Sequence, residues 1–116
     1  MIKKMLLLFV VFCFVVVSNS FAAPLICIDP GHGGSNIGAV KKFDGIELRE
    51  QDINLDVAKF ANYYLTRAGY KTVMTRNSDT DVSFAERAAI ANRNGAGAFV
   101  SIHHNAADNS SCVGSP

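Results

Sequence analysis

The sequence has no large excess of charge of either sign, and its 116 residues contain no internal repeats and no low-complexity blocks. Eleven lysines and arginines stand against ten aspartates and glutamates. Removal of Lys3 and Lys4 with an N-terminal leader would leave nine basic residues and a net charge of −1. Because nucleic-acid-binding domains usually carry a basic patch, we expect no nucleic-acid partner.

Cysteine is scarce, with three residues in the chain. Cys13 lies in an apolar N-terminal run after the bulky Phe12, so a lipoprotein cleavage site is not expected. Cys27 falls in an apolar segment and Cys112 in a polar tail. The two can form a disulfide in an oxidising compartment, or they can remain a buried and an exposed free thiol.

The N-terminus lacks an apolar run of comfortable membrane-spanning length, which is roughly 20 residues. Lys3 and Lys4 precede the uncharged run 5–17, and small residues follow up to Ala22. This order is typical of a secretory signal peptide, and an uncleaved anchor is the alternative. We therefore predict a signal peptide over 1–22. An exported chain of residues 23–116 would be periplasmic or extracellular, would form one small domain, and would have no membrane span after cleavage.

A glycine-rich turn follows the first apolar segment. Leu25 to Ile28 reads as a buried strand, and Pro30 ends it at about Asp29 because proline cannot donate to a sheet. The turn 31–34 presents His32 among glycines, at the end of a strand where open α/β sheets bind ligands. It lacks the lysine and serine or threonine of a P-loop, so a phosphate cradle is not expected. The histidine is a candidate metal ligand or acid–base group, or an incidental residue of a tight turn.

The middle of the chain predicts a polar loop and a helix. Residues 35–45 are polar and glycine-containing, and 46–52 are rich in carboxylates. A stripe with three- and four-residue spacing then predicts one apolar helix face ending before Gly69: Ile53, Val57, Phe60, Ala61, Tyr64, Leu65 and Ala68. Glu50 and Asp52 suit the first turn of a helix. Glu50 is thus either simple helix-start chemistry or a functional carboxylate, and Glu47 is a competing candidate.

The remaining segments complete an alternation of strands and helices. A β-rich segment at 70–75 is followed by a polar loop, a capping box formed by Ser83 and Glu86, and a helix ending near Gly95. A third strand runs from 98 to 103. This order predicts an α/β fold with a mostly parallel sheet, right-handed crossovers and helices on its faces.

The topology brings distant side chains to one edge of the sheet. His32 follows the first strand and His103 ends the third, while Glu50 can return to the same edge from the start of the helix. Two histidines and one carboxylate form a catalytic zinc set with an open position for water. His104 points away from His103 if the strand persists, because side chains alternate.

Several motifs in order resemble the zinc-dependent N-acetylmuramoyl-L-alanine amidases of the amidase_3 type, over nearly all of residues 23–116. The motifs are Asp29-Pro30-Gly31-His32-Gly33-Gly34, Glu50-Gln51-Asp52-Ile53-Asn54-Leu55, Thr75-Arg76, Arg87 with Ala91-Asn92, and Ser101-Ile102-His103-His104-Asn105-Ala106.

The resemblance implies a fold, a cofactor and a substrate. The implied fold is a three-layer α/β/α domain, and the implied reaction is hydrolysis of the amide between N-acetylmuramic acid and L-alanine in peptidoglycan. It implies Zn²⁺ ligands at His32, Glu50 and His103, and it favours Glu50 over Glu47 because the match includes Asp52 and Leu55. Four further motif residues are candidates for supporting the ligands or contacting substrate: Asp29, Arg76, Arg87 and Asn105.

The sequence departs from the family pattern at its C-terminal end. Family domains continue past the position of Pro116 with further strands and helices and a second glutamate that acts as general base or acid. No glutamate follows Glu86 here, and Asp108 is the sole carboxylate after His103. We therefore expect 23–116 to be the N-terminal portion of an amidase catalytic domain. The alternative is an inactive zinc- or wall-binding remnant that keeps the ligands and lacks the general base.

Overall fold

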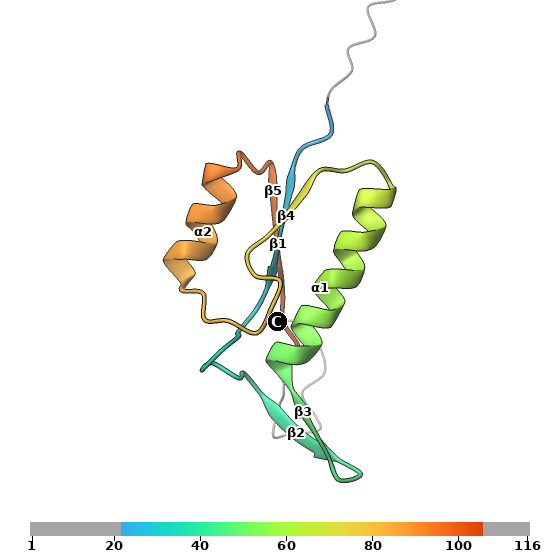
Figure 1. Cartoon of the computed structure of the whole chain (residues 1–116), viewed down its shortest axis with the longest axis vertical. Helices are drawn as coiled ribbons and strands as arrows, with labels where there is room; N and C mark the ends of the chain where they lie inside the picture. The colour runs from blue at the N-terminus through green and yellow to red at the C-terminus, as the bar shows by residue number, and fades with distance from the viewer. Residues whose placement is uncertain (1–21, 106–116) are drawn as a thin grey trace, which may run out of the picture.

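The computed structural model describes residues 22–105, which form a strand–helix alternation (Figure 1). The strands are β1 (Ile26–Pro30), β2 (Val40–Phe43), β3 (Ile46–Arg49), β4 (Thr72–Met74) and β5 (Ala98–Ile102), and the helices are α1 (Glu50–Arg67) and α2 (Phe84–Arg93). The predictions on leader residues 1–21, on Cys112 and on Asp108 fall outside the described residues. Within these residues, neither helix is long and apolar enough to cross a membrane.

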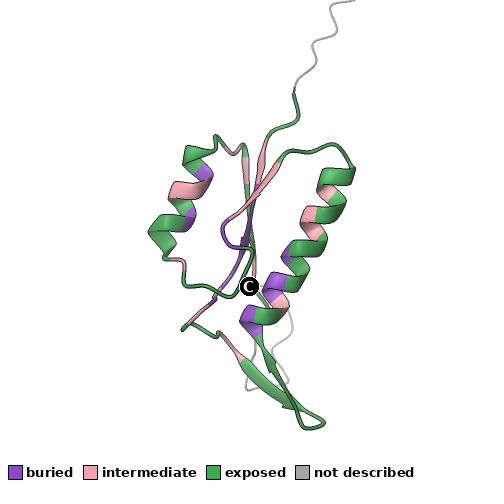
Figure 2. Ribbon diagram, viewed as in Figure 1, coloured by how far each residue is buried: buried purple, intermediate pink, exposed green. Residues whose placement is uncertain are grey.

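A parallel sheet of order β4–β1–β5 forms the centre of the fold. Helix α1 packs on one face and α2 on the other, so the described part has three layers (Figure 1). The central strand β1 is apolar on both faces because helices cover both of them. Its Cys27 and Ile28 are almost fully buried, and β1 is buried over most of its length (Figure 2). The predicted α/β fold with a parallel sheet is confirmed.

The buried thiol of Cys27 is free. Burial, with a smaller contribution from the charge of Asp29, raises the pKa of this thiol above its usual value. A protonated thiol without solvent access is a poor nucleophile, so Cys27 acts as a small core residue.

Helix α1 buries a different face from the predicted one. Val57, Phe60 and Tyr64 are 39, 66 and 66% exposed. The buried positions instead include two polar residues, Gln51 and Asn54, which are 2 and 0% exposed. The apolar periodicity failed here because polar side chains occupy the face that packs against the sheet.

The segment predicted as a polar loop contains part of a hairpin. Strands β2 and β3 pair antiparallel, with Phe43 opposite Ile46. Asp44 and Gly45 both have positive φ, 48° and 76°, as a two-residue type I′ turn requires. All eight strand residues are exposed, which is why no burial pattern marked them as strands. The hairpin projects beyond the end of the parallel sheet and leads directly into α1 (Figure 1).

Helix α2 begins as predicted at Ser83. The Ser83 hydroxyl accepts a hydrogen bond from the Glu86 backbone N–H at 3.1 Å. The Glu86 carboxylate does not complete the capping box but pairs with Arg93 at 2.8 Å.

The strands of the parallel sheet differ slightly from the predicted ranges. Strands β4 and β5 are shorter than predicted, and β1 extends through Pro30. Proline is tolerated there because it is the last residue of the strand.

Candidate functional site

Three side chains from separate parts of the chain meet at one end of the parallel sheet. His32 follows β1, Glu50 is the first residue of α1, and His103 follows β5. Glu50 Oε2 lies 3.2 Å from His32 Nε2, and Glu50 Oε1 lies 3.2 Å from His103 Nδ1. The two imidazole nitrogens are also 3.2 Å apart. The structure therefore brings together the three residues that the sequence pattern placed at this edge.

These separations fit the ligand shell of a metal ion. Two ligand atoms about 2.0–2.1 Å from a tetrahedral zinc lie roughly 3.3 Å from each other, and the three contacts here are each 3.2 Å. One donor atom from each residue falls within 4.8 Å of the others. The competing Glu47 is exposed in the hairpin and binds Arg49 at 2.8 Å. The arrangement can hold a metal ion with Glu50, and not Glu47, as its carboxylate.

The hairpin and β5 fix the Glu50 carboxylate. Its Oε2 accepts the Ala39 backbone N–H at 2.9 Å, and its Oε1 accepts the His104 backbone N–H at 2.9 Å. Burial opposes the charge of Glu50, but these two hydrogen bonds, together with His32 and His103, lower its pKa to about 2. Glu50 is therefore a carboxylate at any pH near neutrality, as a metal ligand must be.

An asparagine sets the orientation of His32. Asn36 Oδ1 lies 2.8 Å from His32 Nδ1. An amide oxygen is an acceptor, so this contact favours a proton on Nδ1 and leaves the Nε2 lone pair facing Glu50 and His103. Hydrogen bonding of the second ring nitrogen is the usual way in which a ligating histidine is oriented.

The His104 side chain contacts Asn54 and not the cluster, but strand alternation is not the reason, because β5 ends at Ile102 and both histidines follow it. His104 Nδ1 lies 2.7 Å from Asn54 Oδ1, and Asn54 Nδ2 donates to the Gly31 carbonyl at 3.1 Å. Asn54 was not predicted as a site residue, although it lies in the Glu50-Gln51-Asp52-Ile53-Asn54-Leu55 motif. A buried asparagine one turn after Glu50, on the same face of α1, is the signal that could have identified it.

Two glycines give the cluster room. A Cβ at Gly31 would overlap the imidazole of His103, and a Cβ at Gly38 would lie 2.8 Å from the side chains of both Glu50 and His32. Gly38 also has a positive φ of 68°. Glycine at positions 31 and 38 therefore leaves the space in which His32, Glu50 and His103 approach one another, in addition to allowing the backbone to turn.

Gly31→Ala should separate metal binding from folding. Gly31 is not among the residues with positive φ, so alanine fits its backbone, but the added methyl displaces the His103 ring. We expect zinc affinity to fall at least tenfold, since a displaced ligand loses its bond, with little change in the unfolding midpoint. Zinc titration and thermal unfolding measure both quantities. Gly45→Asn is the matched control, because the surroundings of Gly45 are open and asparagine tolerates its φ of 76°. Wild-type zinc affinity in Gly31→Ala would contradict the geometry.

The other motif residues lie at different depths. Asp29, Arg76 and Arg87 are 4, 4 and 7% exposed, behind the cluster, while Asn105 is exposed two positions beyond His103. Asp29 forms an ion pair with Arg87 at 2.7 Å. Burial raises the pKa of Asp29, but its three hydrogen-bond donors hold that pKa below its usual value.

Two further carboxylates support the histidine turn and were not predicted from the sequence. Asp79 accepts a hydrogen bond from the backbone N–H of Gly34, and Asp81 accepts one from the backbone N–H of Ser35.

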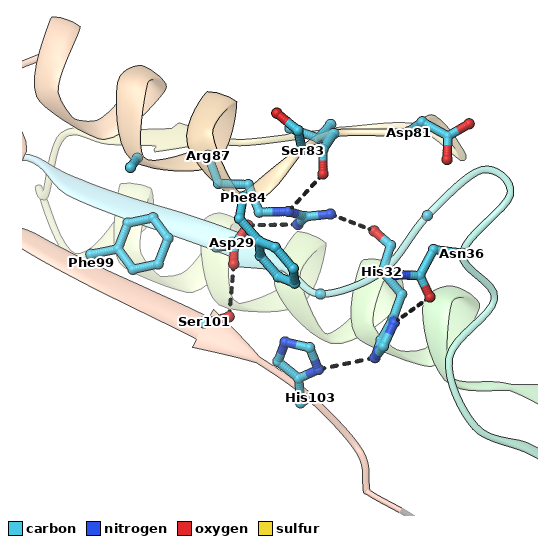
Figure 3. Close-up of a pocket in the computed structure, with 14 residues that line it drawn as sticks. Asp29, His32, Asn36, Asp81, Ser83, Phe84, Arg87, Phe99, Ser101 and His103 are labelled. Atoms are coloured by element: carbon cyan, nitrogen blue, oxygen red, sulfur yellow. Dashed lines mark hydrogen bonds and ion pairs between the residues drawn. The ribbon is translucent and has the colours of Figure 1, made fainter.

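A cleft of about 610 Å³ opens beside the two histidines (Figure 3). Phe84 of α2 and Phe99 of β5 contribute apolar surface, and the buried Arg87 and the exposed Ser101 also line the cleft. The two histidines of the cluster therefore line a cavity large enough for an organic substrate, a usual arrangement for a catalytic site.

Several known proteins are similar to this chain in sequence and in fold. N-acetylmuramoyl-L-alanine amidase LytC of Bacillus subtilis is 42% identical over 97 residues, which are 84% of this chain and 19% of LytC. Cwp6 from Clostridium difficile has a TM-score of 0.72 at 38% identity, covering 77% of this chain and 14% of that one. N-acetylmuramoyl-L-alanine amidase AmiC2 of Nostoc punctiforme has a TM-score of 0.67 at 43% identity, covering 74% of this chain and 46% of that one.

The chain thus spans about a fifth of LytC and about half of the AmiC2 chain. Residues 26–115 match the family Amidase_3, described as N-acetylmuramoyl-L-alanine amidase. The resemblance inferred from the motifs is confirmed by this match and by the shared fold. On these grounds the chain belongs to the Amidase_3 family of N-acetylmuramoyl-L-alanine amidases.

Proposed function

We propose that this chain is the N-terminal part of an exported, zinc-dependent amidase that cleaves the N-acetylmuramoyl–L-alanine amide of peptidoglycan. One observation carries the proposal: in a chain of this family, donor atoms of His32, Glu50 and His103 lie within 4.8 Å of one another beside an open cleft. Two histidines and one carboxylate are a known ligand set of catalytic zinc in amide hydrolases. The substrate follows from the family and from the names of the relatives.

The chain's own residues prepare this site for hydrolysis. Zinc, when bound, lowers the pKa of a coordinated water to about 7 and polarises a carbonyl. Glu50 supplies a permanent negative charge, and the contact with Asn36 favours the tautomer in which His32 Nε2 is free to bind. The cleft leaves the histidines open to a substrate amide, while Phe84 and Phe99 provide apolar surface beside it.

The proposed function is tested with peptidoglycan. Residues 23–116 joined to the C-terminal segment of a family relative should release stem peptides with a free L-alanine amino group from purified sacculi, and a zinc chelator should abolish the release until zinc is restored. Release of muramic acid reducing ends instead would indicate a glycosidase and contradict the proposal.

The second candidate is a zinc- or wall-binding remnant without catalysis. The resemblance implies a general-base glutamate, and residues 87–116 contain none, so residues 23–116 taken alone would bind the wall without cleaving it under this candidate. Binding of sacculi with zinc present, but without release of peptides, is the result that this candidate predicts.

We also propose export with cleavage after Ala22, on the basis of Lys3, Lys4 and the uncharged run that follows them. N-terminal sequencing of the exported form should begin at Ala23. An intact Met1 in a membrane fraction would indicate an anchor instead.

A further inference from the structure

Two buried arginines lie behind the histidine turn and bind its backbone. Arg87 donates from Nη1 to the Pro30 carbonyl at 2.8 Å and from Nη2 to the His32 carbonyl at 2.9 Å. Arg76 donates from Nε to the Pro30 carbonyl at 3.0 Å and from Nη2 to the Gly31 carbonyl at 2.9 Å. Three successive carbonyl groups, from Pro30 to His32, are therefore each held by a guanidinium group.

His32, the last of the three residues whose carbonyl groups the arginines bind, has a strained backbone. His32 has a φ of 61°, in the left-handed region that residues other than glycine rarely adopt. Such a conformation persists where the surrounding structure fixes it, and it concentrates at functional sites. Arg87 is the residue that binds the carbonyl of His32 itself. It therefore acts directly on the peptide group that follows the strained His32.

Asp29 holds the Arg87 guanidinium in place. Its Oδ1 accepts Arg87 Nη1 at 2.7 Å, and Arg87 Nε donates to the Val82 carbonyl at 3.0 Å. With the Pro30 and His32 carbonyls, four of the five guanidinium N–H donors have partners. Both side chains are more than nine-tenths buried, so neither is free to contact a wall polymer in the cleft as its main role.

The Asp29 carboxylate also contacts β5, the strand that leads to His103. Asp29 Oδ2 accepts the Ser101 hydroxyl at 2.7 Å, and Ser101 lies on β5, which ends one residue before His103. Figure 3 shows Asp29 between Arg87 and Ser101, with His32 beyond Arg87 and His103 beyond Ser101. A continuous chain of polar contacts thus runs from the backbone of one histidine to the strand of the other.

We propose that Arg87, held by Asp29, is a positioning residue that sets the separation and orientation of His32 and His103 for metal binding. The inference rests on the proposed metal centre and extends it to residues that bind no metal. An arginine is required because its planar fork reaches the carboxylate and two carbonyls at once. A lysine is a single point charge with no such fixed geometry.

The test compares Arg87→Lys with Arg93→Lys in the full chain. Arg93 lies on the same helix but is exposed and pairs with Glu86 at the surface. The measurements are the zinc dissociation constant, the visible spectrum of the Co²⁺-substituted protein at saturation, and the unfolding midpoint without metal. For Arg87→Lys we expect zinc affinity to fall about 10–100-fold, the usual cost of losing an outer support of a metal ligand, with an altered Co²⁺ spectrum. Arg93→Lys should stay within about twofold, as surface substitutions do.

The spectrum separates positioning from general stability. A variant that is only less stable binds Co²⁺ in the native geometry once saturated, so weaker binding with a wild-type spectrum would overturn the proposal. Wild-type zinc affinity in Arg87→Lys would overturn it as well. Failure of the wild-type chain to bind zinc would instead refute the metal centre.

A milder variant covers the case in which Arg87→Lys does not fold. Ser101→Ala removes one hydroxyl from Asp29 and leaves Arg87 in place. Loss of a single hydrogen bond corresponds to about a fivefold effect, so we expect about fivefold weaker zinc binding with a shifted Co²⁺ spectrum. Unchanged affinity and spectrum in this variant would count against the proposal.

Discussion

His32→Ala and His103→Ala should each reduce zinc content from one ion per chain to a trace. An apparent zinc-binding free energy of about 10–16 kcal/mol, divided among three protein ligands and a water, gives roughly 2.5–4 kcal/mol for each ligand. That loss corresponds to about 10²–10³-fold in affinity. Glu50→Gln should have a similar effect, since it keeps the size of the side chain and removes the charge that balances the ion. Elemental analysis after dialysis measures the content.

Two neighbouring residues provide the controls for these variants. Glu47→Gln changes a carboxylate in the exposed hairpin, which pairs with Arg49. His104→Ala changes a histidine that contacts Asn54 and not the cluster. Both should retain one zinc per chain. If His104→Ala lost the metal while His103→Ala kept it, the side-chain register at the end of β5 would be wrong by one residue.

The second large effect concerns catalysis. We expect residues 23–116 alone to bind zinc but to release little or no peptide from peptidoglycan. The reaction needs a group that moves a proton to the leaving amine, and such groups typically contribute 10²–10⁴-fold. The resemblance to the family implies that a glutamate supplies this group, and residues 87–116 contain none. Addition of a C-terminal segment from a family relative, carrying its glutamate, should therefore raise peptide release by a factor in that range.

Asp108 is the residue that could make this expectation fail. It is the sole carboxylate after His103 in the sequence, and its side chain is shorter than that of glutamate. A misplacement of about 1 Å in a catalytic group can cost 10²-fold, so Asp108 is expected to be a poor substitute. Rapid amide cleavage by residues 23–116, abolished by Asp108→Asn, would show that Asp108 is the base.

The sequence predicted the parallel layers and the three clustered side chains because their signals are local. The run from Leu25 to Ile28, the Ser83 cap and the strand before His103 each mark an element by its own composition. Once the order of strands and helices is known, parallel topology brings the strand ends together. The positions of His32, Glu50 and His103 then follow from where each element begins or ends.

The features that the sequence did not predict depend on residues that are far apart in the chain. The inner face of α1 carries Gln51 and Asn54, whose partners are Asp79 and the carbonyl of Gly31. A hydrophobic pattern cannot identify polar residues that are buried because the site needs them. Likewise, Asp29 and Arg87 are 58 positions apart in the chain, so no local spacing indicates their ion pair.

The hairpin of β2 and β3 was not predicted for a different reason. Its Asp44–Gly45 turn is a strong local signal, but Lys41, Lys42 and Asp44 gave the segment the composition of a loop. The structure shows its importance, because Ala39 at its base exchanges two hydrogen bonds with Glu50: the Glu50 N–H donates to the Ala39 carbonyl, and the Ala39 N–H donates to the Glu50 carboxylate.

A crystal structure of the zinc-loaded chain, with anomalous data collected on both sides of the zinc absorption edge, tests the central claim most directly. We expect one zinc peak per chain in contact with His32 Nε2, the Glu50 carboxylate and His103 Nδ1, with a remaining position open to the cleft. A peak bound by Glu47 or His104, or no peak at these residues in zinc-saturated crystals, would contradict it.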